Sequence, residues 1–291
     1  MNRLENILLI LNPIAGNTDK KTLLNKLGNR LSADGKILEI HKTTGENDQL
    51  KIEKAIKKNQ PDRILVAGGD GTIKLVAGAL HEKKIPIGIL PVGSANGLAS
   101  DLDLPVEPDE FIKIALGKKI REIDAIQIND QLCLHMGDFG LNAELIKNYE
   151  AGNLRGKLGY AMNSISTLYN SEMPYLFTIE ANGKKTSCEG IMLGIANSRK
   201  YGTGALVNPM GKIDDGKFEL LIFKKFDIFE ILKTLRGDVE MSPGFVESIS
   251  TDRANITTLL PIDFQIDGEY CGTKKEITAK ILPKKLHIAT K

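Results

Sequence analysis

The sequence predicts a doubly wound α/β domain followed by a mostly antiparallel β domain. Three observations support this prediction: apolar runs without alternation early in the chain, helical periods near them, and a change to short strands and turns after about residue 122. A chain of 291 residues is long enough to bury two hydrophobic cores. We therefore expect domains at 1–122 and 123–291, with the last few residues able to return to the first domain.

The first apolar runs lie at residues 7–11, 64–67 and 85–90. Runs that are apolar on both faces are typical of strands in a parallel sheet covered by helices. Amphipathic helical periods lie between or after them, and Pro108 and Gly117 suit the start and the stop of one helix. This alternation favours the doubly wound arrangement. The apolar positions of the predicted helices are Ile52, Ala55 and Ile56; Ile73, Val76, Ala77 and Leu80; and Phe111, Ile112, Ala115 and Leu116.

From about Glu122 onward the pattern is one of short strands joined by turns. Two strands are expected around Asn129-Asp130, and a hairpin around Asn182-Gly183, a pair that suits a type I′ turn. Further strands are predicted at 190–198, 217–223, 263–270 and 276–282, and helical patterns at 158–165 and 229–235.

Composition and charge are those of an ordinary globular protein, with 42% hydrophobic and 26% charged residues. Lysine and arginine number 39 against 37 acidic residues, so a net charge of +2 provides no field to attract nucleic acid. No apolar stretch approaches the ~20 residues that span a bilayer, and no cleavage site follows the first apolar run. Three widely spaced cysteines, Cys133, Cys188 and Cys271, support neither a disulfide framework nor a zinc site. A reducing cytoplasm is the expected location.

Three unusual turns follow strands of the first domain: LNPIAGN at 11–17, GGDGT at 68–72 and LPVGSANGLA at 90–99. The carboxyl ends of strands form the ligand crevice of open α/β sheets, so these turns should meet there. Glycine lets backbone N–H groups approach a ligand, and the N-terminus of a following helix adds partial positive charge. That environment suits phosphate. An aspartate between such glycines is costly unless it meets a cation, a ribose or a hydroxyl group.

Simpler explanations of single turns stay open. A tight corner between strand and helix explains NPIAG as well as a ligand does, and Ser94 would also serve as the N-cap of the next helix. Known phosphate motifs do not match, because Lys74 stands where the dinucleotide fingerprint requires its third glycine. Neither a GxxxxGK[ST] loop nor the protein-kinase set of motifs occurs.

The ordered motifs LNPIAG, GGDGT, LPVGSANGLA, GDFGLNAE, IDDGKFELLIF and IDGE resemble those of the diacylglycerol kinase catalytic-domain family. This family includes bacterial lipid kinases and sphingosine kinases, and it shares GGDGT with NAD kinases. The resemblance covers nearly the whole chain. It implies a Rossmann-like domain followed by a β-sandwich domain, with ATP in the cleft between them and a requirement for Mg²⁺.

The resemblance also implies which residues form the site. Glu269 of IDGE corresponds to the catalytic base of the family, with Asp267 beside it. A structural magnesium site of bacterial members falls on Asp215, helped by the backbone carbonyls of Lys212 and Lys217. The nucleotide site would comprise Asn12, Pro13, Gly16, Thr43, Gly69, Asp70, Gly71, Thr72, Ser94 and Asn96.

Phosphoryl transfer gives the acids chemical roles. Asp70 would hold a catalytic Mg²⁺ or orient the acceptor hydroxyl, and Glu269 would take the hydroxyl proton. Asp267 and Glu269 alternate along the chain, so they would share one face of an extended strand. A hairpin turn with two solvated acids is the alternative.

Two further residues are candidates on the substrate side. Asp138 aligns with a segment that approaches the lipid head group in relatives, and Arg199 in SRKYGTG would line the cleft and contact phosphate. A turn-forming aspartate and a polar loop are the respective alternatives.

Two positions depart from the pattern of bacterial diacylglycerol kinases. Asn17 stands where a lysine is usual, and Gly97 where an aspartate is usual. Losing both charges together removes an ionic link without leaving a lone charge. The form GSANGLA looks closer to sphingosine kinases, so the identity of the acceptor stays open.

The leading hypothesis is an ATP-dependent lipid kinase that requires Mg²⁺ and phosphorylates a hydroxyl of a diacylglycerol- or sphingosine-like acceptor in phospholipid biosynthesis. GGDGT also favours an NAD kinase, and Asn17 with Gly97 favours a nucleotide-binding regulator without turnover. The substrate class implies a cytoplasmic protein in transient, peripheral contact with a membrane surface. No nucleic-acid partner is expected, and a homodimer is left open.

Overall fold

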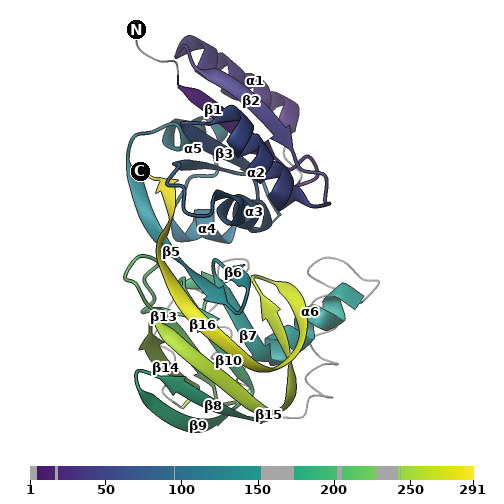
Figure 1. Cartoon of the computed structure of the whole chain (residues 1–291), viewed down its shortest axis with the longest axis vertical. Helices are drawn as coiled ribbons and strands as arrows, with labels where there is room; N and C mark the ends of the chain where they lie inside the picture. The colour runs from purple at the N-terminus through teal and green to yellow at the C-terminus, as the bar shows by residue number, and fades with distance from the viewer. Residues whose placement is uncertain are drawn as a thin grey trace. The chain divides into compact units, whose positions relative to one another are not determined.

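The computed structural model describes residues 5–16, 19–94, 96–151, 174–201, 205–225, 227, 242 and 244–291 (Figure 1). The chain divides into two compact units, residues 1–124 with 284–291 and residues 125–283. The end of the chain therefore returns to the first unit. The helical patterns expected at 158–165 and 229–235 lie outside the described residues, as does Asn17.

A parallel sheet with the strand order β2-β1-β3-β4 forms the first unit. Its strands are β1 (Asn6–Leu11), β2 (Ile37–Lys42), β3 (Arg63–Gly68) and β4 (Ile87–Pro91), and the end of β16 (Glu269–Ala289) pairs with β4 at Ile288. Nearly every residue of β1, β3 and β4 is buried, which confirms the three apolar runs as strands. The residue pattern does not predict β2, because this edge strand is largely exposed and lacks an apolar run.

The helices described in the first unit are α1 (Lys20–Ala33), α2 (Asp48–Asn59), α3 (Asp70–Leu80), α4 (Gly97–Asp101) and α5 (Pro108–Ala115). The structure confirms the predicted helices as α2, α3 and α5, the last with Pro108 at its first position. Helix α1 is not among the predicted helices. Leu23, Leu27 and Leu31 are buried at a helical spacing and Asp19 caps the N-terminus, so a signal was present.

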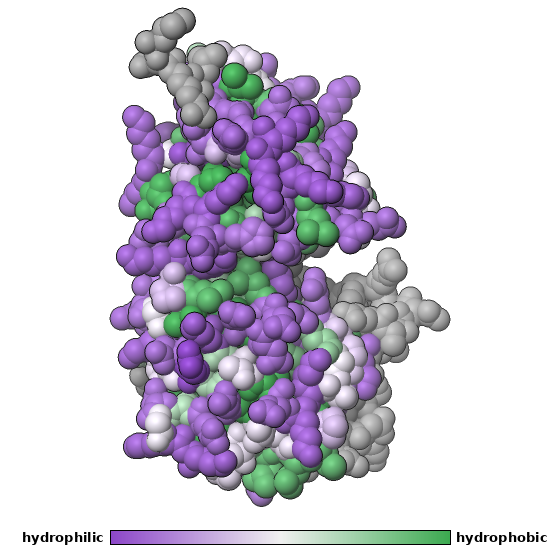
Figure 2. Space-filling view, viewed as in Figure 1, coloured by the Kyte–Doolittle hydropathy of each residue, from purple (hydrophilic) through white to green (hydrophobic). Residues whose placement is uncertain are grey.

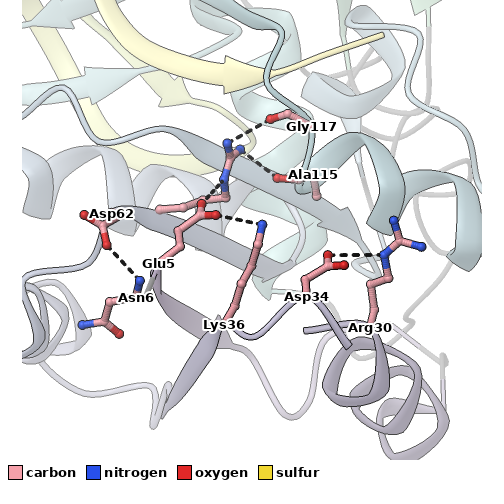
Figure 3. A network of polar contacts seen from close by, with 9 residues as sticks. Glu5, Asn6, Arg30, Asp34, Lys36, Asp62, Ala115 and Gly117 are labelled. Atoms are coloured by element: carbon pink, nitrogen blue, oxygen red, sulfur yellow. Dashed lines mark hydrogen bonds and ion pairs between the residues drawn. The ribbon is translucent and has the colours of Figure 1, made fainter. Parts of the chain in front are cut away.

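A polar network closes the end of this sheet at the amino-terminal ends of β1 and β3 (Figure 3). The Arg63 guanidinium donates to the carbonyls of Ala115 and Gly117, both at 2.9 Å. Ala115 is the last residue of α5, and Gly117 lies two residues beyond it. Glu5 lies 2.8 Å from Lys36 Nζ and 3.5 Å from Arg63 Nε. Because Arg63 satisfies carbonyls that have no partner within the helix, this end of the sheet is built for stability. The glycine turns lie at the opposite ends of the strands.

The second unit is a mostly antiparallel assembly, as predicted, with the strand order β14-β13-β10-β7-β15-β16. In addition, β8 pairs with β15 and β9, and β5 pairs with β16 and β6. Phe139, Phe177, Phe218 and Phe264 lie at its centre without exposure to solvent, with the rings of Phe139 and Phe264 4.7 Å apart. The elements are β5 (Ile120–Ile128), β6 (Gln131–Cys133), β7 (Met136–Gly140), α6 (Leu141–Ala151), β8 (Tyr175–Ala181), β9 (Lys184–Gly190), β10 (Met192–Ala196), β11 (Lys200–Tyr201), β12 (Ala205–Leu206), β13 (Phe218–Phe223), β14 (Val246–Thr251), β15 (Arg253–Ile266) and β16.

The structure confirms two predicted turns and contradicts one predicted strand. Asn182 and Gly183 have φ of +52° and +72°, as a type I′ turn requires, and Asn129 has φ +49° between β5 and β6. The strand predicted at 263–270 is wrong, because the turn between β15 and β16 falls inside it.

Hydrophilic residues cover much of the face shown in Figure 2, with smaller apolar patches between them. Within the described ranges, no helix combines the length and the apolar character needed to cross a bilayer.

Candidate functional site

The three glycine turns of the first unit touch one another. Gly16 has φ +54°, and a Cβ placed there would overlap the Val92 carbonyl oxygen and lie 3.1 Å from the carbonyl carbon of Gly93. A Cβ on Gly93 would lie 2.6 Å from the backbone nitrogen of Gly69. The turns therefore pack backbone against backbone at the carboxyl ends of β1, β3 and β4, where they are predicted to meet.

Asp70 links the second turn to the third. It is the first residue of α3, and its carboxylate accepts hydrogen bonds from the N–H groups of Gly97 (2.7 Å) and Leu98 (3.1 Å) at the start of α4. These N–H groups have no partner within their helix, and the helix dipole favours an anion there. Asp70 thus fixes α4 against α3. Its role towards Mg²⁺ or an acceptor hydroxyl stays a prediction.

The N-cap position of α4 is Asn96, so the alternative in which Ser94 caps this helix is wrong. The Asn96 side chain accepts from the Gly93 N–H and donates to the Gly93 carbonyl, both at 3.0 Å. This ring of hydrogen bonds shapes the third turn and leaves the capping of α4 to Asp70. Ser94 is exposed in the same turn.

The remaining predicted nucleotide contacts lie at the same ends of the strands. Asn12 and Pro13 follow β1, and Asn12 Nδ2 lies 3.5 Å from Thr72 Oγ1 in α3. Thr43 follows β2, is buried, and donates its N–H to the Leu11 carbonyl at 2.9 Å. Residues distant in sequence are therefore brought to one edge of the sheet.

In the second unit, the IDGE segment forms the turn between β15 and β16. Asp267 lies in this turn with φ +53°, so the extended strand with both acids on one face is wrong. Its carboxylate accepts hydrogen bonds from the N–H groups of Leu134 (3.0 Å) and His135 (2.9 Å), so Asp267 is not a solvated acid either. Glu269 begins β16 with an exposed side chain. The two acids therefore have different surroundings, one bound to backbone and the other facing solvent.

Asp138 is connected to this turn from inside the unit. It is fully buried in β7, so the alternative of a turn-forming aspartate is wrong. Its Oδ2 accepts hydrogen bonds from Asn142 Nδ2 (2.7 Å) and Gln265 Nε2, and Gln265 Oε1 accepts the Gly268 N–H (2.7 Å). Burial raises the pKa of the Asp138 carboxyl to about 7, against the lowering effects of Asn142, Gln265 and the Ala143 N–H. A contact between Asp138 and a lipid head group stays a prediction.

A third anchor follows Glu269 in the chain. The Tyr270 hydroxyl donates to Asp263, and Lys147 Nζ from α6 lies 3.0 Å from the same carboxylate. Residues on both sides of Glu269 are therefore held in place. Sequence reasoning misses Gln265, Asp263 and Lys147, because nothing in their local pattern shows which distant residues they contact.

The predicted magnesium residues share the turn before β13. Asp215 is exposed, and its Oδ1 accepts the Lys217 N–H at 3.1 Å. Among the described residues, no three or more His, Cys, Asp or Glu side chains come close enough to hold a metal ion together. An ion here would therefore need backbone oxygens besides Asp215. Arg199 is exposed, and its carbonyl accepts the Asn208 N–H at 3.0 Å.

Two domain families match the chain. The diacylglycerol kinase catalytic domain matches residues 6–128, and the YegS C-terminal NAD kinase beta sandwich-like domain matches residues 138–290. The chain belongs to the diacylglycerol kinase catalytic-domain family. The resemblance seen in the motifs and the predicted order of an α/β unit and a β unit are thereby confirmed.

Individual members of this family are similar over most of their length. A protein from Escherichia coli described as "Probable lipid kinase YegS" is 30% identical, with 82% of each chain covered. One from Chromohalobacter salexigens described as "Probable lipid kinase YegS-like" is 27% identical over 89% of this chain and 86% of its own. A solved Bacillus anthracis diacylglycerol kinase structure is 20% identical, with a TM-score of 0.78 over 100% of this chain and 98% of its own, which shows the shared fold.

Proposed function

We propose that the protein is an ATP-dependent, Mg²⁺-requiring kinase that transfers the γ-phosphoryl group of ATP to a hydroxyl of a lipid. The observation that supports this most is the packing of three glycine turns, backbone against backbone, at the carboxyl ends of a parallel sheet in a member of this family. The relatives described as probable lipid kinases support the substrate class. A lipid substrate also entails transient contact with a membrane surface.

The phosphate groups of ATP would lie against the GGDGT turn and the start of α3. The N-cap residue Gly69 has no side chain, and a Cβ on Gly71 would meet nothing within 4 Å. Backbone N–H groups and the helix dipole attract phosphate at such a position. In this proposal Asp70 keeps the third turn next to the phosphates by capping α4.

Glu269 is our assignment for the base that accepts the hydroxyl proton. The lipid oxygen forms a bond to the γ-phosphorus, the bond from that phosphorus to the oxygen of ADP breaks, and the proton passes to the Glu269 carboxylate. An exposed carboxylate on an anchored turn suits this role, because the acceptor reaches it while the backbone stays in place. Asp267 is the weaker candidate, since its oxygens bind backbone N–H groups.

Oxygen donors in the turn before β13 fit Mg²⁺. Asp215 with the carbonyls of Lys212 and Lys217 would hold the ion, because Mg²⁺ prefers carboxylate, carbonyl and water oxygens. Bound there, Mg²⁺ would supply positive charge and order to this turn.

The test is phosphorylation by the purified protein of a total lipid extract, diacylglycerol, a sphingoid base and NAD, each with labelled ATP and Mg²⁺. We expect label in at least one lipid and none in NAD. Label in NAD alone would identify an NAD kinase. ATP binding without any labelled product would identify a regulator without turnover.

Two glycine substitutions separate a packing role from a ligand role in the turns. Gly71→Ala should keep or slightly raise the melting temperature, because the new methyl group enters open space and alanine favours a helix by about 1 kcal/mol over glycine. It should weaken ATP binding about tenfold or more, because the methyl group keeps phosphate from the backbone.

The matched substitution Gly93→Ala should lower the melting temperature, because its Cβ would lie 2.6 Å from the Gly69 nitrogen. Calorimetric titration with ATP and thermal unfolding measure both effects. Unchanged ATP affinity in Gly71→Ala would show that phosphate does not approach that turn.

A further inference from the structure

Gln265 joins a buried acid to the turn that carries Glu269. It pairs directly with Asp138 across β15 and β7, and both side chains are fully buried. Its Nε2 donates to Asp138 Oδ2, and its Oε1 accepts the Gly268 N–H at 2.7 Å. Gly268 immediately precedes Glu269 and has φ +85°. The chain of contacts Asp138, Gln265, Gly268 thus ends at the residue before the proposed base.

The geometry points to Asp138 and Gln265 as positioning residues that hold the backbone of Glu269 for proton transfer. The inference rests on the proposed function, because Glu269 needs fixed placement only if it acts as a base. In this inference both residues act through the turn, and neither needs to touch substrate.

The orientation of the Gln265 amide gives Asp138 its role. An amide has a donor end and an acceptor end, and rotation by half a turn exchanges them. A carboxylate oxygen only accepts, so Asp138 keeps the NH₂ group of Gln265 on its side. The Gln265 oxygen must then face the Gly268 N–H. If Asp138 offered no acceptor, the Gln265 amide could turn over. Its NH₂ group would then face the Gly268 N–H, which is also a donor.

Asn142 binds the same carboxyl oxygen of Asp138 as Gln265 does. Its Nδ2 donates to the same Oδ2 at 2.7 Å. The Ala143 N–H also acts on this carboxyl, yet the buried Asp138 Oδ1 accepts no hydrogen bond of normal geometry. Burying a carboxyl without full pairing is costly, so stability alone does not favour an acid at this position. The gain is the fixed direction of Gln265, because Asp138 Oδ2 accepts from the amides of both Asn142 and Gln265.

Displacement of a catalytic group by about 1 Å costs roughly 10²-fold in rate, so loss of this support should slow the reaction and not weaken ATP binding. We expect Gln265→Met, which keeps the length of the side chain, to lower kcat about 10- to 100-fold with an unchanged KM for ATP. Asp138→Asn should lower kcat about 3- to 10-fold, because its amide still offers one acceptor oxygen.

Amide hydrogen exchange of the whole protein provides a readout that does not depend on activity. In Gln265→Met the Gly268 N–H loses its acceptor, and its exchange should accelerate about tenfold or more. Thr258→Val is the matched control: Thr258 is buried on the same strand, and its hydroxyl donates to the Leu260 carbonyl at 2.8 Å, away from the turn. This variant should change neither kcat nor exchange at Gly268.

The outcomes separate this inference from the proposed function. An active wild type whose kcat survives Gln265→Met, despite faster exchange at Gly268, would overturn the positioning role alone. Unchanged exchange at Gly268 would overturn the contact itself. A wild type that phosphorylates no lipid would overturn both. Should Gln265→Met fail to fold, Asp138→Asn gives the same readouts with a side chain of the same shape.

Discussion

Glu269→Gln should lower the turnover of lipid phosphorylation by about 10²- to 10⁴-fold, the usual contribution of a general base. The substitution keeps the shape of the side chain and replaces the carboxylate by a neutral amide, which cannot take the proton. Because Glu269 is exposed while the neighbouring residues hold the turn, the melting temperature should not change. Steady-state kinetics with saturating ATP, together with thermal unfolding, measure both quantities.

Asp267→Asn is the informative control, because the two acids lie two positions apart and have different surroundings. Asp267 Oδ1 accepts from both Leu134 and His135, and Oδ2 accepts from Leu134 as well. Asparagine keeps one neutral oxygen and places an NH₂ group where the second oxygen was, so a loss of about 1–3 kcal/mol in stability is expected. Any loss of turnover in Asp267→Asn should be accompanied by a lower melting temperature. Full activity in Glu269→Gln, with an inactive but stable Asp267→Asn, would transfer the role of base to Asp267.

The fold was largely readable from the sequence, because buried parallel strands leave continuous apolar runs. The runs at 7–11, 64–67 and 85–90 became β1, β3 and β4 for this reason. The edge strand β2 was not predicted, because most of its residues face solvent. The prediction of a strand at 263–270 was wrong for another reason: a two-residue turn at Asp267-Gly268 interrupts an otherwise strand-like pattern.

The candidate site was readable only in part. Strand order alone predicts that the glycine turns meet, because carboxyl ends of parallel strands share one edge. The partners of the acids were not predictable, because each lies far along the chain: Asp70 caps a helix 27 residues away, and Asp267 binds a backbone N–H 133 residues away. Local patterns therefore singled out these acids as candidates, and the contacts of each acid could not be predicted from them.

Asp138→Asn should remove a dependence of stability on pH. The ordinary pKa of this carboxyl is 3.8, and burial raises it to about 7 in the folded protein. Between these values the folded state retains a proton that the unfolded state has lost. The favourable contribution of Asp138 to the free energy of unfolding is therefore fully present below pH 3.8, declines as pH rises above this value, and is lost above about pH 7. The slope is about 1.4 kcal/mol per pH unit, or roughly 4 kcal/mol over the whole window.

Asparagine stays neutral in both states, so the variant should lose this slope. Urea unfolding of both proteins at pH 4.5, 6 and 8 measures it, because all other groups titrate in both and cancel in the difference. The gain in stability of the variant over wild type should grow with pH; a constant difference would show that Asp138 is ionised throughout. Since the same acid orients Gln265, we expect a variant that is more stable at pH 8 and yet slower. An activity that costs stability is typical of a functional group and not of a structural one.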